Sequence, residues 1–392
     1  MTNNFILEGR KKFAVVVAPL LQDKRTRTII LFLALYTFLL SINTMGAGFK
    51  NLKDESEYFT NFIDDPISSF CVGLLITGLI QSSSGTTSIL VALCAEGVIP
   101  VDLTIPAIMG ANIGTAITNT VVSFGHLGRK NEFKLAFGGS LVHDYFNILA
   151  VLILLPLELV FHPLEYTATG MAYLFKDIGG IKFSSPIKTA TKPIVHFFEG
   201  LVAASHYQTA FLVLLGVFIL FMSLKIIVSC TRLFVNEYGE ALVEKYLFKG
   251  PKGSFALGLG LTATVQSSSI TTSLIIPLIA SGVLKIRKIL PYTIGANIGT
   301  TVTTILAALA ASAATGTTAP LILAFVHLLF NVFGGAIIYG IKPLRNVPIV
   351  LAERSGQWAV DSRKGFIVLV GGYVIGTSYV FPILYLLLRR MF

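Results

Sequence analysis

The sequence predicts an all-α integral membrane protein with two inverted repeats, each containing a re-entrant hairpin and a broken helix. Three observations predict this fold class: a low content of charged residues, long uncharged stretches, and a polar motif that occurs twice. The 392 residues are 54% hydrophobic and 13% charged, whereas soluble domains carry about 25% charged residues. Mean hydropathy is +0.78. These values place most of the chain in lipid.

Several stretches without Asp, Glu, Lys or Arg are long enough to cross a hydrocarbon core, which takes roughly 20 helical residues. Lipid offers backbone groups no hydrogen bonds, so such segments form helices or closed barrels, and long apolar runs favour helices. The stretches include Thr28 to Phe49, Pro66 to Ala95, Tyr207 to Leu224, Ser254 to Leu284, Ile289 to Ile341 and Gly365 to Leu388.

The formal net charge of +10 does not indicate a nucleic-acid partner, because the cations lie between the apolar stretches rather than on one basic face. Cys71, Cys94 and Cys230 lie in or beside apolar segments without metal-ligand spacing, so we expect neither a disulfide framework nor a metal cofactor. Neither a Gly-x-Ser-x-Gly nor a His-Glu-x-x-His motif occurs, which argues against an enzyme.

A polar motif occurs twice at an offset of 185 positions. Gln81 to Ser88 reads QSSSGTTS, and Gln266 to Ser273 reads QSSSITTS. At the same offset, Gly110 to Thr115 and Gly295 to Thr300 both read GANIGT. Two motifs in the same order indicate an internal duplication.

A His-xxx-Asn pair also repeats, since His143 and Asn147 match His327 and Asn331 after one residue of slippage. Each His precedes its Asn by one helical turn, so the two side chains share a helix face. Hydrogen bonding between helices is the favoured interpretation, and a proton carrier is the alternative. Asp144 lies deep in an apolar stretch and is a further candidate for an intramembrane role.

Loop charge predicts the orientation of each repeat, because Lys and Arg concentrate in short cytoplasmic loops. The N-terminal arm is basic and Lys50 to Asp65 is acidic, so repeat one begins outside. Arg129 to Lys134 returns inside, and Thr231 to Gly253 is basic, so repeat two begins inside. The same count leaves Arg389 and Arg390 outside, against the rule, unless the number of spans is off by one.

The predicted organisation follows from these apolar and charged stretches. In order, it is an interfacial helix (1–24), a first membrane helix (28–49), repeat one (66–159), an extracytoplasmic loop (160–206), a membrane helix (207–230), a cytoplasmic segment (231–253), repeat two (254–341), a basic loop (342–364) and a last membrane helix (365–392).

Each Gln-Ser-Ser-Ser segment is predicted to break a re-entrant hairpin. The run Pro66 to Ile80 gives roughly 22 Å of helix, less than a full crossing. A break frees backbone N–H groups that favour an anion, and carbonyls that suit sodium. No Arg or Lys lies in either motif, so a bound anion would depend on co-bound cations. Packing of small residues is the alternative interpretation.

These residues resemble the type II sodium-dependent phosphate cotransporter family, whose hallmark is a pair of Gln-Ser-Ser-Ser motifs in inverted repeats. Val142 to Asn147 and Gly295 to Ala308 also read like that family, and the resemblance covers most of residues 40–342. It implies sodium-coupled symport of inorganic phosphate by alternating access, with co-transported Na⁺ and no cofactor. A multi-pass protein of the bacterial inner membrane is expected, and a homodimer is left open.

The resemblance implies that both motifs line one site for phosphate and sodium, and side-chain chemistry suggests how the ligands divide. The predicted phosphate ligands are Ser83, Ser84, Ser268, Ser269, Asn112 and Asn297. The predicted sodium ligands are Gln81, Ser82, Thr86, Thr115, Gln266, Ser267, Thr271 and Thr300.

Two alternatives stay open. The same site could take sulfate, arsenate or a dicarboxylate, because backbone N–H donors discriminate weakly between anions. A membrane sensor that binds phosphate without moving it is the other alternative, and a fused soluble signalling domain would favour it.

Overall fold

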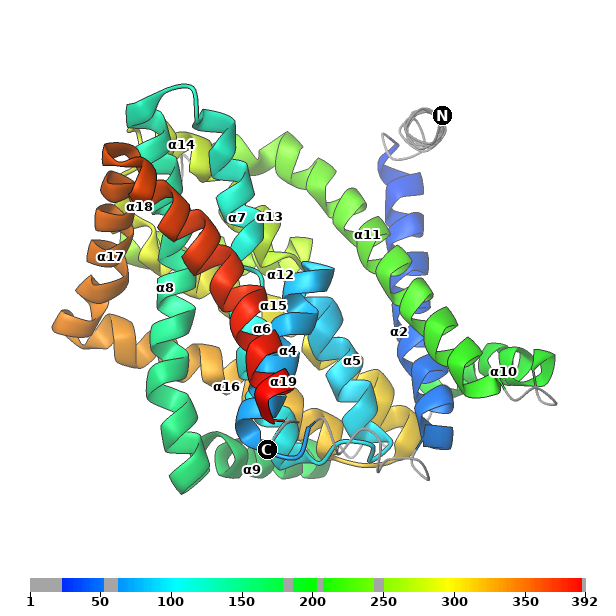
Figure 1. Ribbon diagram of the computed structural model, residues 1–392. Coiled ribbons are helices and arrows are strands. Elements are labelled where there is room, and N and C mark those ends of the chain that lie inside the picture. The colour runs from blue at the N-terminus through cyan, green and yellow to red at the C-terminus, as the bar shows by residue number, and fades with distance from the viewer. Residues whose placement is uncertain (1–22, 53–62, 179–185, 203–206, 243–249, 390–392) are drawn as a thin grey trace, which may run out of the picture.

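The computed structural model describes residues 23–52, 63–178, 186–202, 207–242 and 250–389, and the regular elements in these ranges are all helices (Figure 1). Among them, seven helical spans are long and apolar enough to cross a membrane, which confirms the predicted all-α membrane fold. The spans are built on α2 (Lys24–Leu52), α6 with α7 (Val101–Ile113, Ala116–Ser123), α8 (Lys130–Phe161), α11 (Gln208–Leu242), α15 (Leu290–Thr315), α16 (Ala319–Gly340), and α18, η5 and α19 in succession (Arg363–Ile367, Val368–Val380, Phe381–Arg389).

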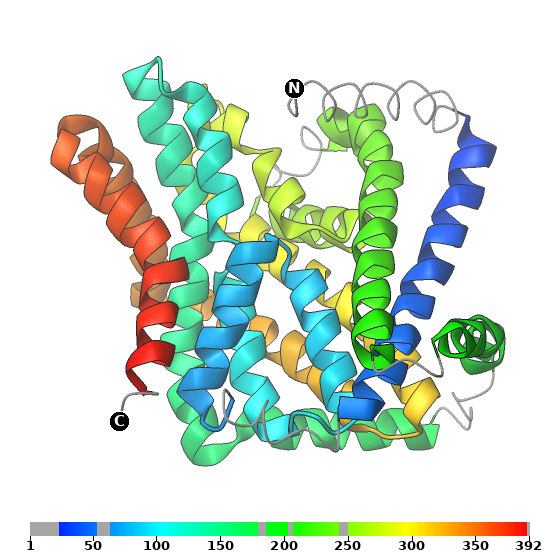
Figure 2. The same ribbon diagram turned by 45° about the vertical axis from the view of Figure 1, so that its right-hand side comes forward.

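The first hairpin consists of α4 (Pro66–Ile80) and α5 (Ser83–Ala95), which lie side by side in Figure 2. The carboxylate of Asp65 caps the first turn of α4 by accepting two backbone N–H hydrogen bonds, as is usual at helix starts. α4 ends at Gln81, whose left-handed φ of 58° turns the chain, and the hydroxyl of Ser82 caps α5. The chain therefore breaks at Gln-Ser-Ser-Ser, as the sequence predicts.

The second hairpin breaks in the same way. α12 (Pro251–Val265) ends at Gln266 with a φ of 56°, and Ser267 caps α13 (Ser268–Ser273). A further short helix, α14 (Ile276–Ala280), completes the returning arm. In Figure 1, α14 lies at the top of the molecule, whereas the free ends of α4 and α5 lie toward the bottom. The two hairpins thus open toward opposite sides.

Glycines bring each hairpin close to its neighbouring long helix. A methyl group on Gly258 of α12 would overlap the carbonyl oxygen of Tyr292, and one on Gly295 of α15 would overlap that of Phe255. Contacts this close exclude every residue with a Cβ. The equivalent glycines of the first half make the same contacts between α4 and α6, and they are Gly73 and Gly110.

The two GANIGT segments differ in backbone structure. In the first half, α6 ends at Ile113, and Gly114 and Thr115 separate it from α7. In the second half, α15 continues through Gly299 and Thr300 without interruption. The sequence allows unwinding or close approach at these glycines, and the first copy does both whereas the second only packs closely.

The segment predicted as an outer loop, residues 160–206, contains two helices, α9 (Pro163–Ile178) and α10 (Pro186–Leu201). α9 is capped from outside itself, because the carboxylate of Glu158 on α8 accepts the backbone N–H of Leu164 at 2.7 Å. The loop was predicted from the mixed charge of this segment, although Pro163 and Glu165 in the first turn of α9 are helix-start signals.

Two charged segments on the other side are also helical. α11 extends to Leu242 through much of the predicted cytoplasmic segment 231–253, and α17 (Lys342–Asp361) occupies most of the predicted basic loop 342–364. Lys, Arg and Glu are good helix formers, so their presence marks the exit from lipid rather than the end of a helix. The predicted interfacial helix over 1–24 lies outside the described residues except for its last two positions.

The end of the last span lies beside the open end of the first hairpin (Figure 1). Arg389 donates from Nη2 to Oδ2 of Asp64 at 2.8 Å and from Nη1 to Oγ of Ser68 at 2.6 Å. Arg389, which the loop-charge count left on the acidic side, is therefore paired with an acid there. Arg390 lies outside the described residues.

Candidate functional site

The breaks of the two hairpins face one another across a cavity of about 60 Å³. Both Gln-Ser-Ser-Ser segments line it, residues 81–84 and 266–269, together with Thr115 and two apolar residues of α11, Leu224 and Val228. Roughly 10–15 Å³ of such volume holds one water molecule, so the cavity has room for several oxygen-sized atoms. Most of the predicted ligands are thus brought together.

Backbone groups at the breaks are available to a ligand. The first N–H groups of α5, at Ser83 and Ser84, have no partner within the helix, and the helix dipole adds positive potential there. The last carbonyl groups of α4 and α12 add acceptors on the other side of each break. Ser84 Oγ lies 3.5 Å from the carbonyl oxygen of Gln266, so the two breaks are in contact.

The two glutamines of the motifs differ in their hydrogen bonds. Gln81 Oε1 accepts from the hydroxyl of Thr118 at 2.9 Å, and its Nε2 donates to the carbonyl of Gly78. Gln266 Oε1 is buried and has no hydrogen-bond partner among the described residues. Because leaving a buried oxygen unpaired is costly, Gln266 is suited to contribute its oxygen to a bound cation.

Five predicted ligands do not line this cavity. The hydroxyls of Thr86, Thr271 and Thr300 each donate to the backbone carbonyl four residues earlier, at 3.1, 3.0 and 3.0 Å. Asn112 and Asn297 lie instead in a polar network between the long helices. These five side chains support the helices around the cavity.

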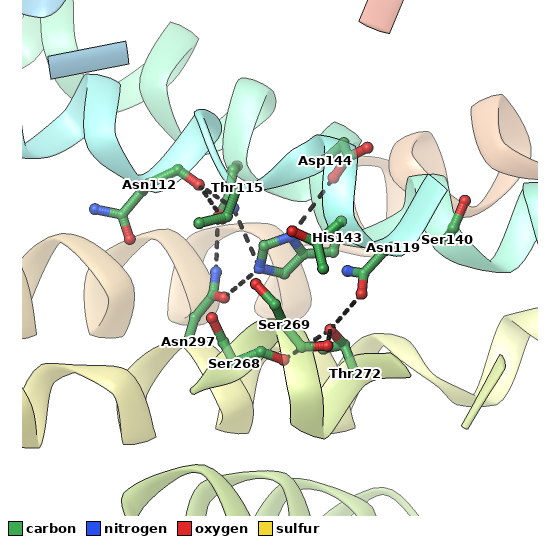
Figure 3. Close-up of polar contacts among 12 residues, drawn as sticks. Asn112, Thr115, Asn119, Ser140, His143, Asp144, Ser268, Ser269, Thr272 and Asn297 are labelled. Atoms are coloured by element: carbon green, nitrogen blue, oxygen red, sulfur yellow. Dashed lines mark hydrogen bonds and ion pairs between the residues drawn. The ribbon is translucent and has the colours of Figure 1, made fainter. Parts of the chain in front are cut away.

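In that network, side chains of the first half bind the second GANIGT segment (Figure 3). His143 Nε2 on α8 lies 2.7 Å from Oδ1 of Asn297 on α15. The Nδ2 of Asn297 donates to Oδ1 of Asn147 at 2.6 Å. Both residues of the first His-xxx-Asn pair are thus hydrogen-bonded to one asparagine of the other repeat.

The converse contacts are longer. Nε2 of His327 and Nδ2 of Asn331, both on α16, each lie 3.4 Å from Oδ1 of Asn112 on α6. Each His-xxx-Asn pair therefore contacts the GANIGT asparagine of the opposite repeat. This agrees with the interpretation of the two histidines as residues that hydrogen-bond between helices.

Threonines make a second set of contacts across the repeats. Thr87 Oγ1 on α5 lies 2.9 Å from Thr304 Oγ1 on α15. At the equivalent positions 185 residues apart, the hydroxyl of Thr272 on α13 donates to Oδ1 of Asn119 on α7 at 3.0 Å. The helix that follows each break is thus hydrogen-bonded to a helix of the other half, α5 to α15 and α13 to α7.

Comparison with known proteins identifies the family. A family model described as Na⁺/Pi-cotransporter matches residues 37–182 and 219–341, and the matched residues include both hairpin breaks and both GANIGT segments. The chain belongs to the Na⁺/Pi cotransporter family. This confirms the family resemblance drawn from the motifs.

Several curated proteins are similar to this family member. Sodium-dependent phosphate transport protein 2B of Homo sapiens is 30% identical over 429 residues, which cover 86% of this chain and 62% of the human protein. Protein 2A of Rattus norvegicus is 30% identical over 402 residues, covering 84% of this chain and 63% of the rat protein. The chain thus spans less than two thirds of these relatives' length. No solved structure matches.

One acidic residue of this Na⁺/Pi cotransporter family member lies next to the network. The carboxyl group of Asp144 is buried, and its Oδ1 lies 3.5 Å from Nδ1 of His143 (Figure 3). The position after His327 in the second half is Leu328, so only the first half carries this acid. Both carboxylate oxygens of Asp144 and Nδ1 of His143 are buried without a hydrogen-bond partner among the described residues. The contact is an ion pair only when the imidazole is protonated, and an acid at membrane depth is costly without one.

Three residues near the site carry no signal in the sequence. Leu224 and Val228 are ordinary apolar residues of a membrane helix, yet they close one side of the cavity. The hydroxyl of Tyr379 in the last span donates to the carbonyl of Gly78 at 2.7 Å, just before the first break. Neither α11 nor the last span is part of the duplication, so comparing the repeats could not have found them.

Proposed function

We propose that this protein moves inorganic phosphate into the cell together with sodium ions, as a symporter that works by alternating access. Its membership of the Na⁺/Pi cotransporter family supports this proposal, as do the names of its relatives. The observation that carries the proposal is the single cavity formed by both hairpin breaks.

The charge balance of the cavity explains why phosphate would need sodium. Phosphate is an anion, and no Lys or Arg is among the described residues that line the cavity. Hydroxyl and backbone N–H donors stabilise an anion, but buried charge without a counterion is costly. Sodium ions bound in the same cavity would offset that charge, so the two substrates would bind as one unit.

The chemistry of each residue around the cavity suggests whether it would bind phosphate or sodium. Hydroxyl groups of Ser83 and Ser268, with the free N–H groups of the first break, would donate to phosphate. The unpaired Oε1 of Gln266 and the carbonyls that end α4 and α12 would bind sodium, which prefers oxygen ligands. Movement of one hairpin relative to the other would then open the cavity to either side in turn.

Uptake of radiolabelled phosphate into proteoliposomes tests this function. We expect accumulation with an inward sodium gradient and little uptake when potassium replaces sodium. Competition by excess unlabelled sulfate, arsenate or a dicarboxylate serves as the control for anion identity. Uptake that ignores sodium would contradict the proposal, and so would accumulation of another anion in place of phosphate. Phosphate binding without uptake would favour a sensor.

A further inference from the structure

A second, larger cavity of about 420 Å³ lies at the start of α12, on the side of the molecule that carries the basic segment before α15. Three basic side chains reach it, from Arg287 and Lys288 in that segment and from Arg345 on α17. No Asp or Glu occurs among the described residues that line it. The cavity is separate from the hairpin breaks and shares no residue with them.

An unpaired hydroxyl lies within this basic cavity. Ser254 is 1% exposed, and its Oγ has no hydrogen-bond partner among the described residues. It sits in the first turn of α12, where the N-cap residue Gly250 supplies no side-chain hydrogen bond. The N–H groups of Lys252 and Gly253 are therefore left for another acceptor, at the positive end of a 15-residue helix.

The three cations are not equally available. Arg287 is held by Glu353, with Nε to Oε1 and Nη2 to Oε2 both at 3.0 Å. The guanidinium of Arg345 lies 5.3 Å from the ring centre of Tyr339, which fixes it at the cavity edge. Lys288 is exposed. Lys288 and Arg345 thus give the cavity a positive charge that Glu353 does not neutralise.

An apolar groove of about 450 Å³ adjoins the cavity. The two share Pro251, Pro291 and Tyr339, so the groove begins where the basic cavity ends. Its other lining residues come mainly from the apolar faces of α12, α15 and α16, and they include Phe255, Ile294, Ile298, Val332 and Ala336. A ligand that fits both parts has an anionic end and a hydrocarbon chain.

We propose that this combined site binds one anionic phospholipid. The headgroup phosphate accepts from Ser254 Oγ and from the free N–H groups of α12, while Lys288 and Arg345 balance its charge. One acyl chain lies along the groove beside Ile298. Free phosphate would use the polar part alone, and the adjoining groove is the reason to assign a lipid. Basic pockets between membrane helices bind anionic headgroups by the same chemistry.

Occupation of this site would stabilise the second hairpin. The start of α12 forms one wall, and α15, α16 and α17 form the others. A lipid between them would hold the open end of the hairpin in place. The proposal does not depend on which anion the central cavity carries.

Thermal unfolding of the purified protein in detergent tests the site. We expect phosphatidylglycerol to raise the unfolding temperature by several degrees more than phosphatidylcholine with the same acyl chains. The double variant Lys288→Gln/Arg345→Gln should lose at least half of that difference. The matched control is Lys285→Gln, which removes an exposed cation of the same segment that lines a neighbouring cavity instead.

A groove variant separates a lipid from a free anion. Ala336→Trp fills the groove at an exposed position and should also reduce the effect of phosphatidylglycerol. The proposal is overturned if the two lipids stabilise equally, or if Lys285→Gln loses as much as the double variant. It is also overturned if inorganic phosphate alone reproduces the effect and Ala336→Trp leaves it unchanged, since this would indicate a site for the free anion.

Discussion

Ser268 shows how the candidate site is built at the scale of single residues. It begins α13 immediately after the second break and lines the central cavity with its counterpart Ser83. Neither hydroxyl is needed to cap a helix, because Ser82 and Ser267 do so. Ser83 and Ser268 are therefore free to bind a ligand, whereas their neighbours hold the backbone.

The variant Ser268→Ala should weaken substrate binding without unfolding the protein. A hydrogen bond to a charged group contributes about 1.5–3 kcal/mol, which corresponds to a rise of roughly tenfold or more in the half-saturating phosphate concentration. Uptake kinetics in proteoliposomes measure this change. Ser281→Ala is the control, because Ser281 is exposed and bonds only within its own turn. If both variants behave alike, Ser268 is not a ligand.

The sequence located the hairpin residues because polar side chains within apolar stretches are conspicuous and occur twice. It could not distinguish Gln81 from Gln266, which occupy equivalent positions. The Thr118 hydroxyl donates to Gln81 Oε1, whereas the hydroxyl of the equivalent Thr303 and Gln266 Oε1 both lack a hydrogen-bond partner among the described residues. A contact of that kind depends on three-dimensional packing, and no local pattern encodes it.

At the scale of helices, glycine contacts join each hairpin to one long helix. Gly258→Ala should destabilise the protein by about 1–3 kcal/mol or more, since its methyl group would overlap the Tyr292 carbonyl and force α12 away from α15. Gly260→Ala is the matched control, because the space around Gly260 in the same helix is open. Unfolding temperatures in detergent compare the two. Equal effects would show that this close contact is unimportant.

Helix positions were predictable where hydrophobicity alone defines them. The membrane spans and the two breaks follow from apolar length and from polar residues within it. α9, α10 and α17 were not predicted. They lie outside the long apolar stretches, where loops and helices have the same charged composition. The uninterrupted α15 was equally hidden, since its GANIGT segment is identical to the one that separates α6 from α7.

At the scale of the whole molecule, the pairing of Arg389 with Asp64 places the end of the chain's last span. Leu388→Cys and Gly170→Cys should react with a membrane-impermeant thiol reagent from one side, and Gly128→Cys from the other. Cys71, Cys94 and Cys230 are buried, which keeps the background low. Labelling of intact and of inside-out vesicles makes the comparison. If Leu388→Cys is labelled from the same side as Gly128→Cys, the placement of the last span's end beside the first hairpin's open end is wrong.

Loop charge predicts an orientation for the whole chain, but it cannot predict the partner of Arg389. Asp64 and Arg389 are 325 residues apart, and a charge rule that counts loops one by one cannot pair them. The same limitation hid the crossed contacts between the His-xxx-Asn pairs and the GANIGT segments. The duplication indicated that the two His-xxx-Asn pairs occupy equivalent positions in the two repeats. It did not indicate that each pair contacts the GANIGT segment of the opposite repeat.

The contact between Thr87 and Thr304 differs in kind from the glycine contacts. Either hydroxyl can donate or accept, so the pair can exchange roles when a neighbouring oxygen comes within reach. Each hydroxyl also has a second partner: Thr304 Oγ1 lies 2.8 Å from Nδ1 of His327, and Thr87 Oγ1 donates to the carbonyl of Ser84 at 3.3 Å. Under the proposed alternating-access function, a hairpin that moves along the other half would exchange one hydrogen bond for another at these hydroxyls. Separation of the two halves would instead leave these buried hydroxyls without a partner, which is costly.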